Sequence, residues 1–241
     1  MKCFGMVILL WSICSCLFAR TIYVARHGQV GDKNYFDNVS GLKLMPLGRE
    51  QAQLLAHYLI KKCRFNGTII ASPFYRTIET SLPTAKLLEK KVILDPGLQE
   101  MNRGSSISGM TFIQIEERFP GMTVKGRSFT EPWRIANEPD ETRTKRTAKA
   151  LKRILEDNPG DLLLVTHGAI VGDIRKIMNE KLPRKKQASG MVWNCSLWIY
   201  ELDDNGQVQS ARGTTEFLQD EKVTNNCKAG KLENERWKKK K

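Results

Sequence analysis

Short apolar runs alternate with amphipathic segments along most of the chain. The apolar runs are rich in Val, Ile and Leu and are bounded by Gly, Pro or polar residues, a pattern typical of strands. The predicted strands are 21–25, 68–72, 91–95, 161–165, 191–202 and one near 207–211. The predicted helices are 46–62, 75–90 with a kink or interruption at Pro83, 111–119, 140–157 and 170–179. This alternation predicts an α/β fold, a three-layer α/β/α sandwich around a mainly parallel central sheet.

Two predicted strands end in a histidine followed by a glycine, in "TIYVARHG" (21–28) and "LLLVTHG" (162–168). Ligands of parallel sheets bind beyond the carboxyl ends of the strands, and the arginine of "ASPFYR" follows a third such end. We therefore expect one pocket built from Arg26, His27, Arg76 and His167. Two cations and two imidazoles suit a group with several anionic oxygens, such as phosphate. The alternatives are two buried core histidines, or a zinc site, which the adjacent arginines disfavour by repulsion.

The first 19 residues combine one lysine with an apolar run that ends at Ala19, which is typical of a secretory signal peptide. The run is short for a membrane span of about 20 residues, so no stable span is expected after processing. A less favoured alternative is a bacterial lipoprotein box in "ICSC", with Cys16 lipidated. We expect a secreted or periplasmic protein. Its expected parts are a signal peptide (1–19), one domain (20–221) and a basic, disordered tail (222–241).

The formal net charge is +13, and much of it lies in the last third of the chain. Such an excess attracts nucleic acid, anionic surfaces or small phosphorylated molecules. No nucleic-acid-binding motif accompanies the charge. The expected partner is therefore a small phosphorylated substrate rather than nucleic acid.

Cleavage after Ala19 leaves three cysteines, Cys63, Cys195 and Cys227. Their spacing does not match a zinc site, and it allows at most one disulfide, with Cys63–Cys227 as the candidate. Cys195 is expected to be buried in the strand 191–202. Three sequons begin at Asn38, Asn66 and Asn194. Glycans would suit the first two in a eukaryotic secretory route, whereas Asn194 is expected within the same strand.

Five motifs occur in a fixed order: "ARHG", "LMPLGREQAQLLAHYL", "ASPFYRTIET", "LQEMNRG" and "LLLVTHG". In this order they resemble the histidine phosphatase superfamily, the phosphoglycerate-mutase-like group. The resemblance extends over about residues 21–203, nearly the whole mature chain. Each motif is weak alone, and their specificity comes from the order and from their positions relative to the predicted strands.

The resemblance implies a phosphohistidine mechanism with His27 as the nucleophile and Glu100 as the general acid and base. The residues implied to bind the phosphoryl group are Arg26, Gly28, Gln29, Arg76 and His167. Gly28 is expected to let the backbone approach the phosphate closely, since it has no Cβ. No metal and no other cofactor is implied. Spacing alone does not choose the acid among Glu100, Glu79, Glu131 and Asp173.

The expected function is hydrolysis of phosphate monoesters, as in a histidine-type acid phosphatase. One alternative is a phosphomutase that uses the same site. The loop "GDKNYFDNVSG" (31–41) lacks the Trp- and Asn-rich stretch of mutases, which favours a phosphatase. The other alternative is a catalytically silent binding module, and the presence of Arg26, His27, Arg76 and His167 argues against it.

Overall fold

The computed structural model describes residues 20–31, 36–37, 41–101 and 109–218. Several predictions concern residues outside these ranges. They are the signal peptide with Cys16, the sequon at Asn38, the Cys63–Cys227 disulfide and the tail 222–241. Within the described ranges, Cys63 and Cys195 form no disulfide. The same ranges contain no helix with both the length and the apolarity that a membrane crossing requires.

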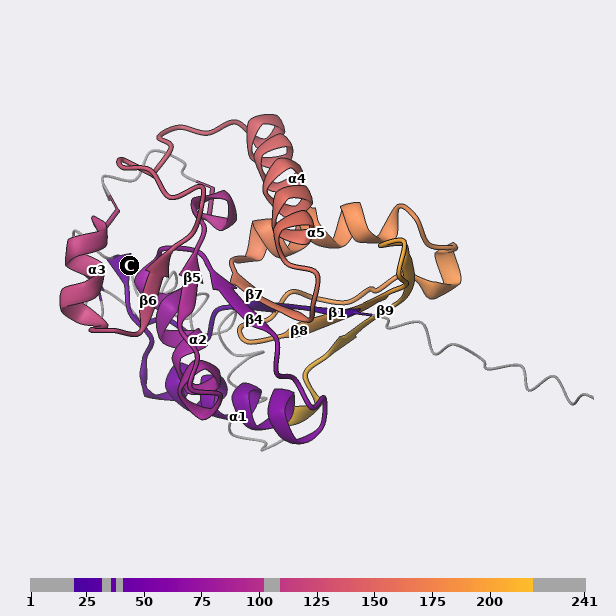
Figure 1. The fold of residues 1–241 in the computed structure, drawn as a ribbon, viewed down its shortest axis with the longest axis horizontal. Coiled ribbons are helices and arrows are strands. Elements are labelled where there is room, and N and C mark those ends of the chain that lie inside the picture. Colours follow the sequence, from indigo (N-terminus) through magenta and orange to yellow (C-terminus); the bar gives the residue numbers. More distant parts are fainter. Residues whose placement is uncertain (1–19, 32–35, 38–40, 102–108, 219–241) are drawn as a thin grey trace, which may run out of the picture.

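A mixed sheet of seven strands forms the centre of the molecule, in the order β6-β5-β4-β7-β1-β8-β9 (Figure 1). The first five strands in this order are parallel, β8 runs antiparallel to them, and β9 is antiparallel to β8 and so has the direction of the first five. The strands are β1 (Arg20–Arg26), β4 (Thr68–Ala71), β5 (Val92–Leu94), β6 (Thr123–Lys125), β7 (Leu162–Thr166), β8 (Leu197–Leu202) and β9 (Val208–Thr214). A separate pair is formed by β2 (Phe36–Asp37) and β3 (Gly41–Leu42). The predicted fold class is confirmed.

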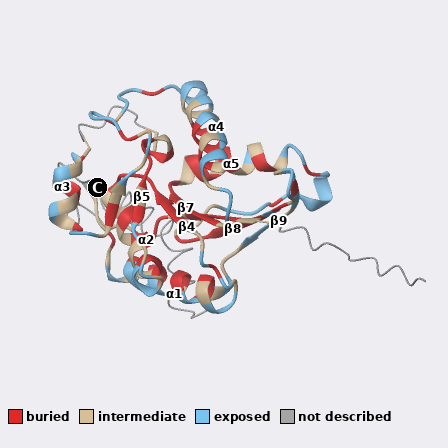
Figure 2. Ribbon diagram, viewed as in Figure 1, coloured by how far each residue is buried: buried red, intermediate tan, exposed pale blue. Residues whose placement is uncertain are grey.

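Helices cover both faces of the sheet (Figure 1). They are α1 (Pro46–Lys61), α2 (Tyr75–Leu87), α3 (Phe112–Arg118), α4 (Asp140–Asp157) and α5 (Gly168–Asn179). Alternate residues of a strand point to opposite faces. Tyr23 and Ala25 of β1 accordingly pack in the core with α1, α2 and α3, whereas Ile22 and Val24 pack in the core with α4 and α5. Buried residues therefore concentrate in the sheet and on the inner faces of the helices (Figure 2).

One local prediction is wrong, and for another the structure excludes one of its two alternatives. Strand β8 begins at Leu197, and the residues before it form a turn that contains Asn194 and Cys195, rather than continuing the strand. Cys195 is buried as expected, but it has a φ of 58° and its N–H donates to the carbonyl of His27 at 3.1 Å. Cys195 and Ser196 are buried because they pack beside the end of β1, where the N–H of Arg26 also donates to the carbonyl of Ser196 at 3.2 Å. At Pro83 the alternative of an interruption is excluded, because α2 is continuous over Tyr75–Leu87.

Candidate active site

The site residues lie at the carboxyl ends of three neighbouring parallel strands, β4, β7 and β1. Arg26 is paired with Thr166 at the end of β7, and Ala71 is paired with Val165 one residue earlier. The N–H of His27 then donates to the carbonyl of Thr166 at 2.9 Å. Residues that are 140 positions apart in sequence therefore meet at one edge of the sheet, where such folds bind ligands.

His27 is held in one tautomer. Its side chain is buried, and Nδ1 lies 2.7 Å from the carbonyl oxygen of Gly28. A carbonyl oxygen can only accept, so Nδ1 carries the hydrogen and Nε2 keeps its lone pair. Burial lowers the pKa of His27 well below its usual value, and the positive charges of Arg76 and Arg26 lower it further. The imidazole is therefore neutral, with Nε2 available as a nucleophile.

His167 lies beside His27, with 5.4 Å between the ring centroids. It is fully buried, and its Nε2 lies 2.8 Å from the hydroxyl oxygen of Ser72. Burial and the charge of Arg76 lower the pKa of His167 well below its usual value. Its Nδ1 is buried without a hydrogen-bond partner among the described residues. His167 also precedes the first turn of α5, where the helix dipole favours an anion.

The two predicted arginines flank these rings. Arg26 at the end of β1 donates from Nη1 to the carbonyl of Val192 at 2.8 Å. Arg76 lies in the first turn of α2, with its guanidinium carbon 4.5 Å from the centroid of Phe74. The pKa of Arg76 is lowered to about 10, mainly by burial. The negative charge of Glu100 raises this pKa, and the positive charges of Arg134 and Arg26 lower it. Arg76 is still charged at neutral pH, so the site combines fixed positive charge with two neutral imidazoles.

Gly28 and Gln29 follow the end of β1 and are hydrogen-bonded to helices α2 and α1. The N–H of Gly28 donates to the hydroxyl oxygen of Thr80 at 3.0 Å, and the N–H of Gln29 donates to Oε1 of Gln51 at 2.9 Å. A Cβ on Gly28 would lie 2.5 Å from the carbonyl oxygen of Gly48. The structure thus gives a different reason for this glycine from the one expected. The missing Cβ allows α1 to pack against the end of β1, whether or not a phosphate is bound.

The three carboxylates that competed with Glu100 all have other partners. Glu79 accepts hydrogen bonds from Nε of Arg49 and from the N–H of Leu44. Asp173 is held by two nitrogens of Arg143, at 2.7 and 3.1 Å. Glu131 is exposed and accepts from the N–H of Phe112 at 2.9 Å.

Glu100 has a different environment. Its carboxylate is close enough to Arg76 to raise the pKa of that guanidinium. It is half-buried, and its Oε1 accepts from the N–H of Met101 at 2.9 Å. Among the four candidates, Glu100 is the carboxylate whose charge acts on Arg76.

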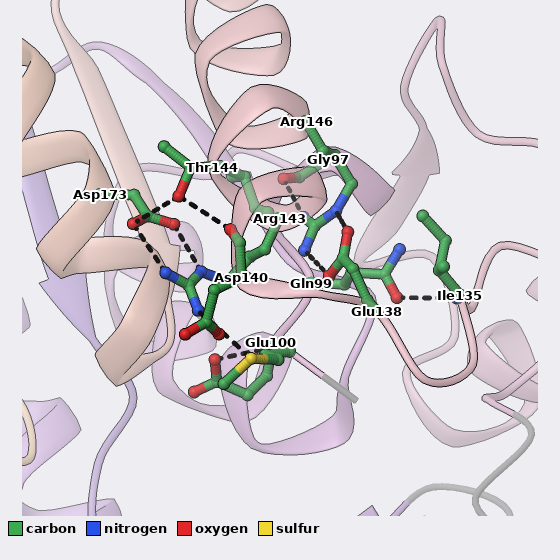
Figure 3. A network of polar contacts seen from close by, with 12 residues as sticks. Gly97, Gln99, Glu100, Ile135, Glu138, Asp140, Arg143, Thr144, Arg146 and Asp173 are labelled. Carbon is green, nitrogen blue, oxygen red and sulfur yellow. Dashed lines mark hydrogen bonds and ion pairs between the residues drawn. The ribbon is translucent and has the colours of Figure 1, made fainter. Parts of the chain in front are cut away.

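A polar network positions the segment that carries Glu100 (Figure 3). Arg146 of α4 donates to the carbonyl of Gly97 at 2.6 Å and binds both carboxylate oxygens of Glu138 at 2.7 Å. Arg143, one turn earlier on α4, binds Asp173 of α5 and contacts the sulfur of Met101 at 3.2 Å. These contacts connect the residues around Glu100 to both helices on one face of the sheet.

The sequence interpretation missed two residues at this site, Ser72 and Arg134. Ser72 directly follows β4, so its position at a strand end was a usable signal. Arg134 lies in an irregular segment between β6 and α4 and has no such signal. Its guanidinium carbon lies 4.7 Å from the centroid of Phe74, the same ring that Arg76 contacts. Within the described ranges, no group of three or more His, Cys, Asp or Glu side chains is placed to hold a metal ion.

Comparison with known families gives a match over most of the described chain. The profile of the histidine phosphatase superfamily (branch 1) matches residues 22–214. The chain belongs to the histidine phosphatase superfamily. The resemblance found in the sequence is thereby confirmed.

Solved structures of the histidine phosphatase superfamily share the fold. A mycobacterial glucosyl-3-phosphoglycerate phosphatase is 22% identical with a TM-score of 0.54, over 81% of this chain and 96% of that one. The ecdysone phosphate phosphatase of Bombix mori is 17% identical with a TM-score of 0.53, over 79% and 92% of the two chains. Among curated proteins, the transcription factor tau 55 kDa subunit of Saccharomyces cerevisiae is 41% identical over 95 residues. The match covers 36% of this chain and only 22% of that protein.

Proposed function

We propose that this protein hydrolyses phosphate monoesters through a phosphohistidine on His27. The observation that carries the proposal is the hydrogen bond from Nδ1 of His27 to the carbonyl of Gly28, which leaves Nε2 unprotonated in a ring that the charges of Arg76 and Arg26 affect. A buried neutral imidazole beside two guanidiniums suits attack on a phosphoryl group better than it suits a structural role.

The reaction has two steps. In the first, the lone pair of Nε2 of His27 forms a bond to phosphorus while the P–O bond to the alcohol breaks. Glu100 gives its proton to the departing alkoxide oxygen. In the second, the Glu100 carboxylate removes a proton from water, the water oxygen attacks phosphorus and the N–P bond breaks. Phosphate is released, and His27 and Glu100 return to their starting protonation states.

The remaining site residues stabilise charge. Phosphoryl transfer depends mainly on positioning and on neutralising the equatorial oxygens. Arg26 and Arg76 supply fixed positive charge, and Nδ1 of His167 is a buried polar atom with no other partner in the described chain. These groups provide the electrostatic stabilisation that other phosphatases obtain from metal ions, so we propose a metal-independent reaction.

The first test compares His27→Ala with the matched variant His57→Ala, because His57 is an exposed histidine on α1. His27→Ala should abolish release of phosphate from para-nitrophenyl phosphate, and His57→Ala should retain it. Rapid quenching of the unmodified protein should trap an acid-labile, base-stable phosphoenzyme. Activity that disappears with EDTA and returns with zinc or magnesium would contradict the metal-independent mechanism.

Hydrolysis is the proposed outcome, rather than isomerisation on the same site. The proteins of this fold compared above from mycobacteria and Bombix mori are both phosphatases, which supports this choice. The test supplies 3-phosphoglycerate with catalytic 2,3-bisphosphoglycerate and follows 2-phosphoglycerate and free phosphate. If 2-phosphoglycerate forms much faster than free phosphate, the protein is a mutase.

The low pKa of His27 supports a further part of the proposal, activity in acid. A nucleophile that stays neutral below its usual pKa remains competent there. The value of kcat/KM for para-nitrophenyl phosphate should therefore show no loss between about pH 6.5 and 5.5 of the kind that an ordinary histidine would give. A fall with an apparent pKa near 6.5 would contradict this assignment.

We also propose that the protein is exported, with residues 1–19 as a cleaved signal peptide. The support is the sequence pattern of one lysine and an apolar run that ends at Ala19. N-terminal sequencing of the protein from its native source should give a chain that begins near Arg20. A lipidated Cys16 would favour the lipoprotein alternative, and an intact Met1 would disprove export.

A further inference from the structure

The hydrogen bond that fixes the proposed nucleophile depends on a peptide group that follows a glycine. Nδ1 of His27 donates to the carbonyl oxygen of Gly28 at 2.7 Å. The same planar peptide group carries the N–H of Gln29 on its opposite side. Glycine allows a wider range of backbone conformations than any other residue, so local sterics do not determine the direction of this carbonyl. Its direction has to be set by contacts with other elements.

Gln51 of helix α1 makes such a contact on the other side of the peptide group. It is fully buried, and its Oε1 accepts from the N–H of Gln29 at 2.9 Å. An N–H can only donate, so the amide oxygen of Gln51 rather than its nitrogen faces Gln29. The C=O and the N–H of one peptide group point in opposite directions. A fixed N–H of Gln29 therefore also fixes the carbonyl of Gly28 toward His27.

Helix α1 lies directly against this part of the backbone, which places Gln51 at the required distance. A Cβ on Gly48 would lie 2.1 Å from the carbonyl oxygen of Gln29 and 2.8 Å from its nitrogen. The N–H of Met45, just before the first turn of α1, donates to the carbonyl of Gln29 at 3.1 Å. Gln51 follows Gly48 by three residues, and residues three apart share one face of a helix. Gly48 and Gln51 therefore both face Gln29.

Thr80 makes a neighbouring contact that has a different effect. Its hydroxyl oxygen accepts from the N–H of Gly28 at 3.0 Å. This N–H belongs to the preceding peptide group, between His27 and Gly28, and the backbone torsions of Gly28 separate the two groups. Thr80 therefore holds the start of the loop, whereas Gln51 acts on the peptide group whose carbonyl binds His27.

We infer that Gln51 is a positioning residue that sets the tautomer of His27 through the peptide group between Gly28 and Gln29. This inference deepens the proposed phosphohistidine reaction, and its kinetic part rests on that reaction. With the carbonyl of Gly28 in place, the neutral ring carries its hydrogen on Nδ1 and its lone pair on Nε2. If the carbonyl turns away, the hydrogen can move to Nε2, which then has no lone pair with which to attack phosphorus.

The experiment observes the tautomer directly and needs no turnover. The protein is labelled with isotope-enriched histidine, and long-range proton–nitrogen correlation spectra at neutral pH show which ring nitrogen carries hydrogen. The chain has three histidines, so His57 and His167 serve as internal references. Gln51→Met removes the acceptor and keeps an unbranched side chain of similar size. Gln53→Met is the matched control, because Gln53 is exposed on the same helix.

In the unmodified protein, His27 should carry its hydrogen mainly on Nδ1. Gln51→Met should raise the fraction of His27 with hydrogen on Nε2 by about tenfold or more, the equivalent of one hydrogen bond, and Gln53→Met should not change it. If Gln51→Met does not fold, Gln51→Asn gives the same test, because its side chain is one methylene shorter and its oxygen no longer reaches the N–H. An unchanged tautomer of His27 in the folded variant would overturn the inference.

Steady-state kinetics separate this inference from the proposed activity. With para-nitrophenyl phosphate, kcat of Gln51→Met should fall by the same factor as the fraction of His27 rings whose Nε2 carries no hydrogen, and KM should change less. If the tautomer responds to Gln51 but the unmodified protein releases no phosphate, the positioning role stands and the proposed activity fails. If kcat falls while the tautomer stays unchanged, the proposed activity stands and the positioning role fails.

Discussion

The two buried histidines should make the protein less stable in mild acid. His27 is 5% exposed and His167 is 0% exposed, and both have pKa values well below the usual 6.5. In the unfolded chain each takes up a proton as the pH falls through about 6.5, whereas in the folded chain neither does. Protons therefore favour the unfolded state, and the free energy of unfolding should fall with pH until the folded-state pKa is reached.

The size of the effect follows from the unfolded-state pKa. An unfolded histidine is about one quarter protonated at about pH 7 and about nine tenths protonated at about pH 5.5. Each histidine that stays neutral in the folded state then costs about 1.2 kcal/mol over this interval, and the two together cost about 2.5 kcal/mol. Most carboxylates remain ionised in this range, so they contribute little to the change.

The assay is urea denaturation at several pH values in phosphate-free buffers, since bound phosphate would stabilise the folded state. His27→Asn and His167→Asn should each remove about half of the pH-dependent loss, and the double variant should remove most of it. His57→Asn is the matched control, because His57 is exposed, and it should leave the pH dependence unchanged. If the double variant loses stability with pH as steeply as the unmodified protein, the two histidines are not neutral in the folded state.

Three further predictions concern single residues. Glu100→Gln should slow hydrolysis of alkyl phosphates severely and of para-nitrophenyl phosphate much less, because the better leaving group needs no proton; equal losses would indicate a positioning role. Gly28→Ala should lower the midpoint of urea denaturation, because its Cβ would clash with the backbone of Gly48; an unchanged midpoint would mean that α1 can shift. Ser72→Ala should reduce kcat about tenfold by removing the hydrogen bond to His167, which steady-state kinetics can test.

The sequence predicted the positions of the main site residues because they follow strands. Arg26, His27 and His167 continue two of the most apolar runs in the chain, and parallel strands place their ends on one edge. Arg76 is in the first turn after a third strand. An apolar run that marks a buried strand, and the residue at its carboxyl end, can both be recognised in the local sequence. This part of the site could therefore be predicted without coordinates.

The parts that the sequence did not predict depend on long-range contacts. The residues on either side of Arg134 are held by the side chain of Gln99, which donates to the carbonyl of Trp133 and accepts from the N–H of Ile135, and nothing near Arg134 in the sequence indicates these contacts. The turn at Cys195 was mistaken for strand, because residues that pack beside a site are as apolar as residues in a sheet. The packing role of Gly28 depends on Gly48 in another element. Each of these features requires knowledge of which segments are neighbours in the fold.

The location of β1 has a consequence for how the chain acquires its structure. β1 is the first strand of the part of the chain that the structure describes, yet its two neighbours in the sheet are β7 and β8, which end at Thr166 and Leu202. A chain emerging from the ribosome holds this apolar strand without either partner until most of the protein has been made. Contacts between such distant segments form slowly, and an unpaired strand edge invites association with other chains. We therefore expect the nascent chain to need protection by a chaperone, and any product that ends before β7 to aggregate rather than to retain partial activity.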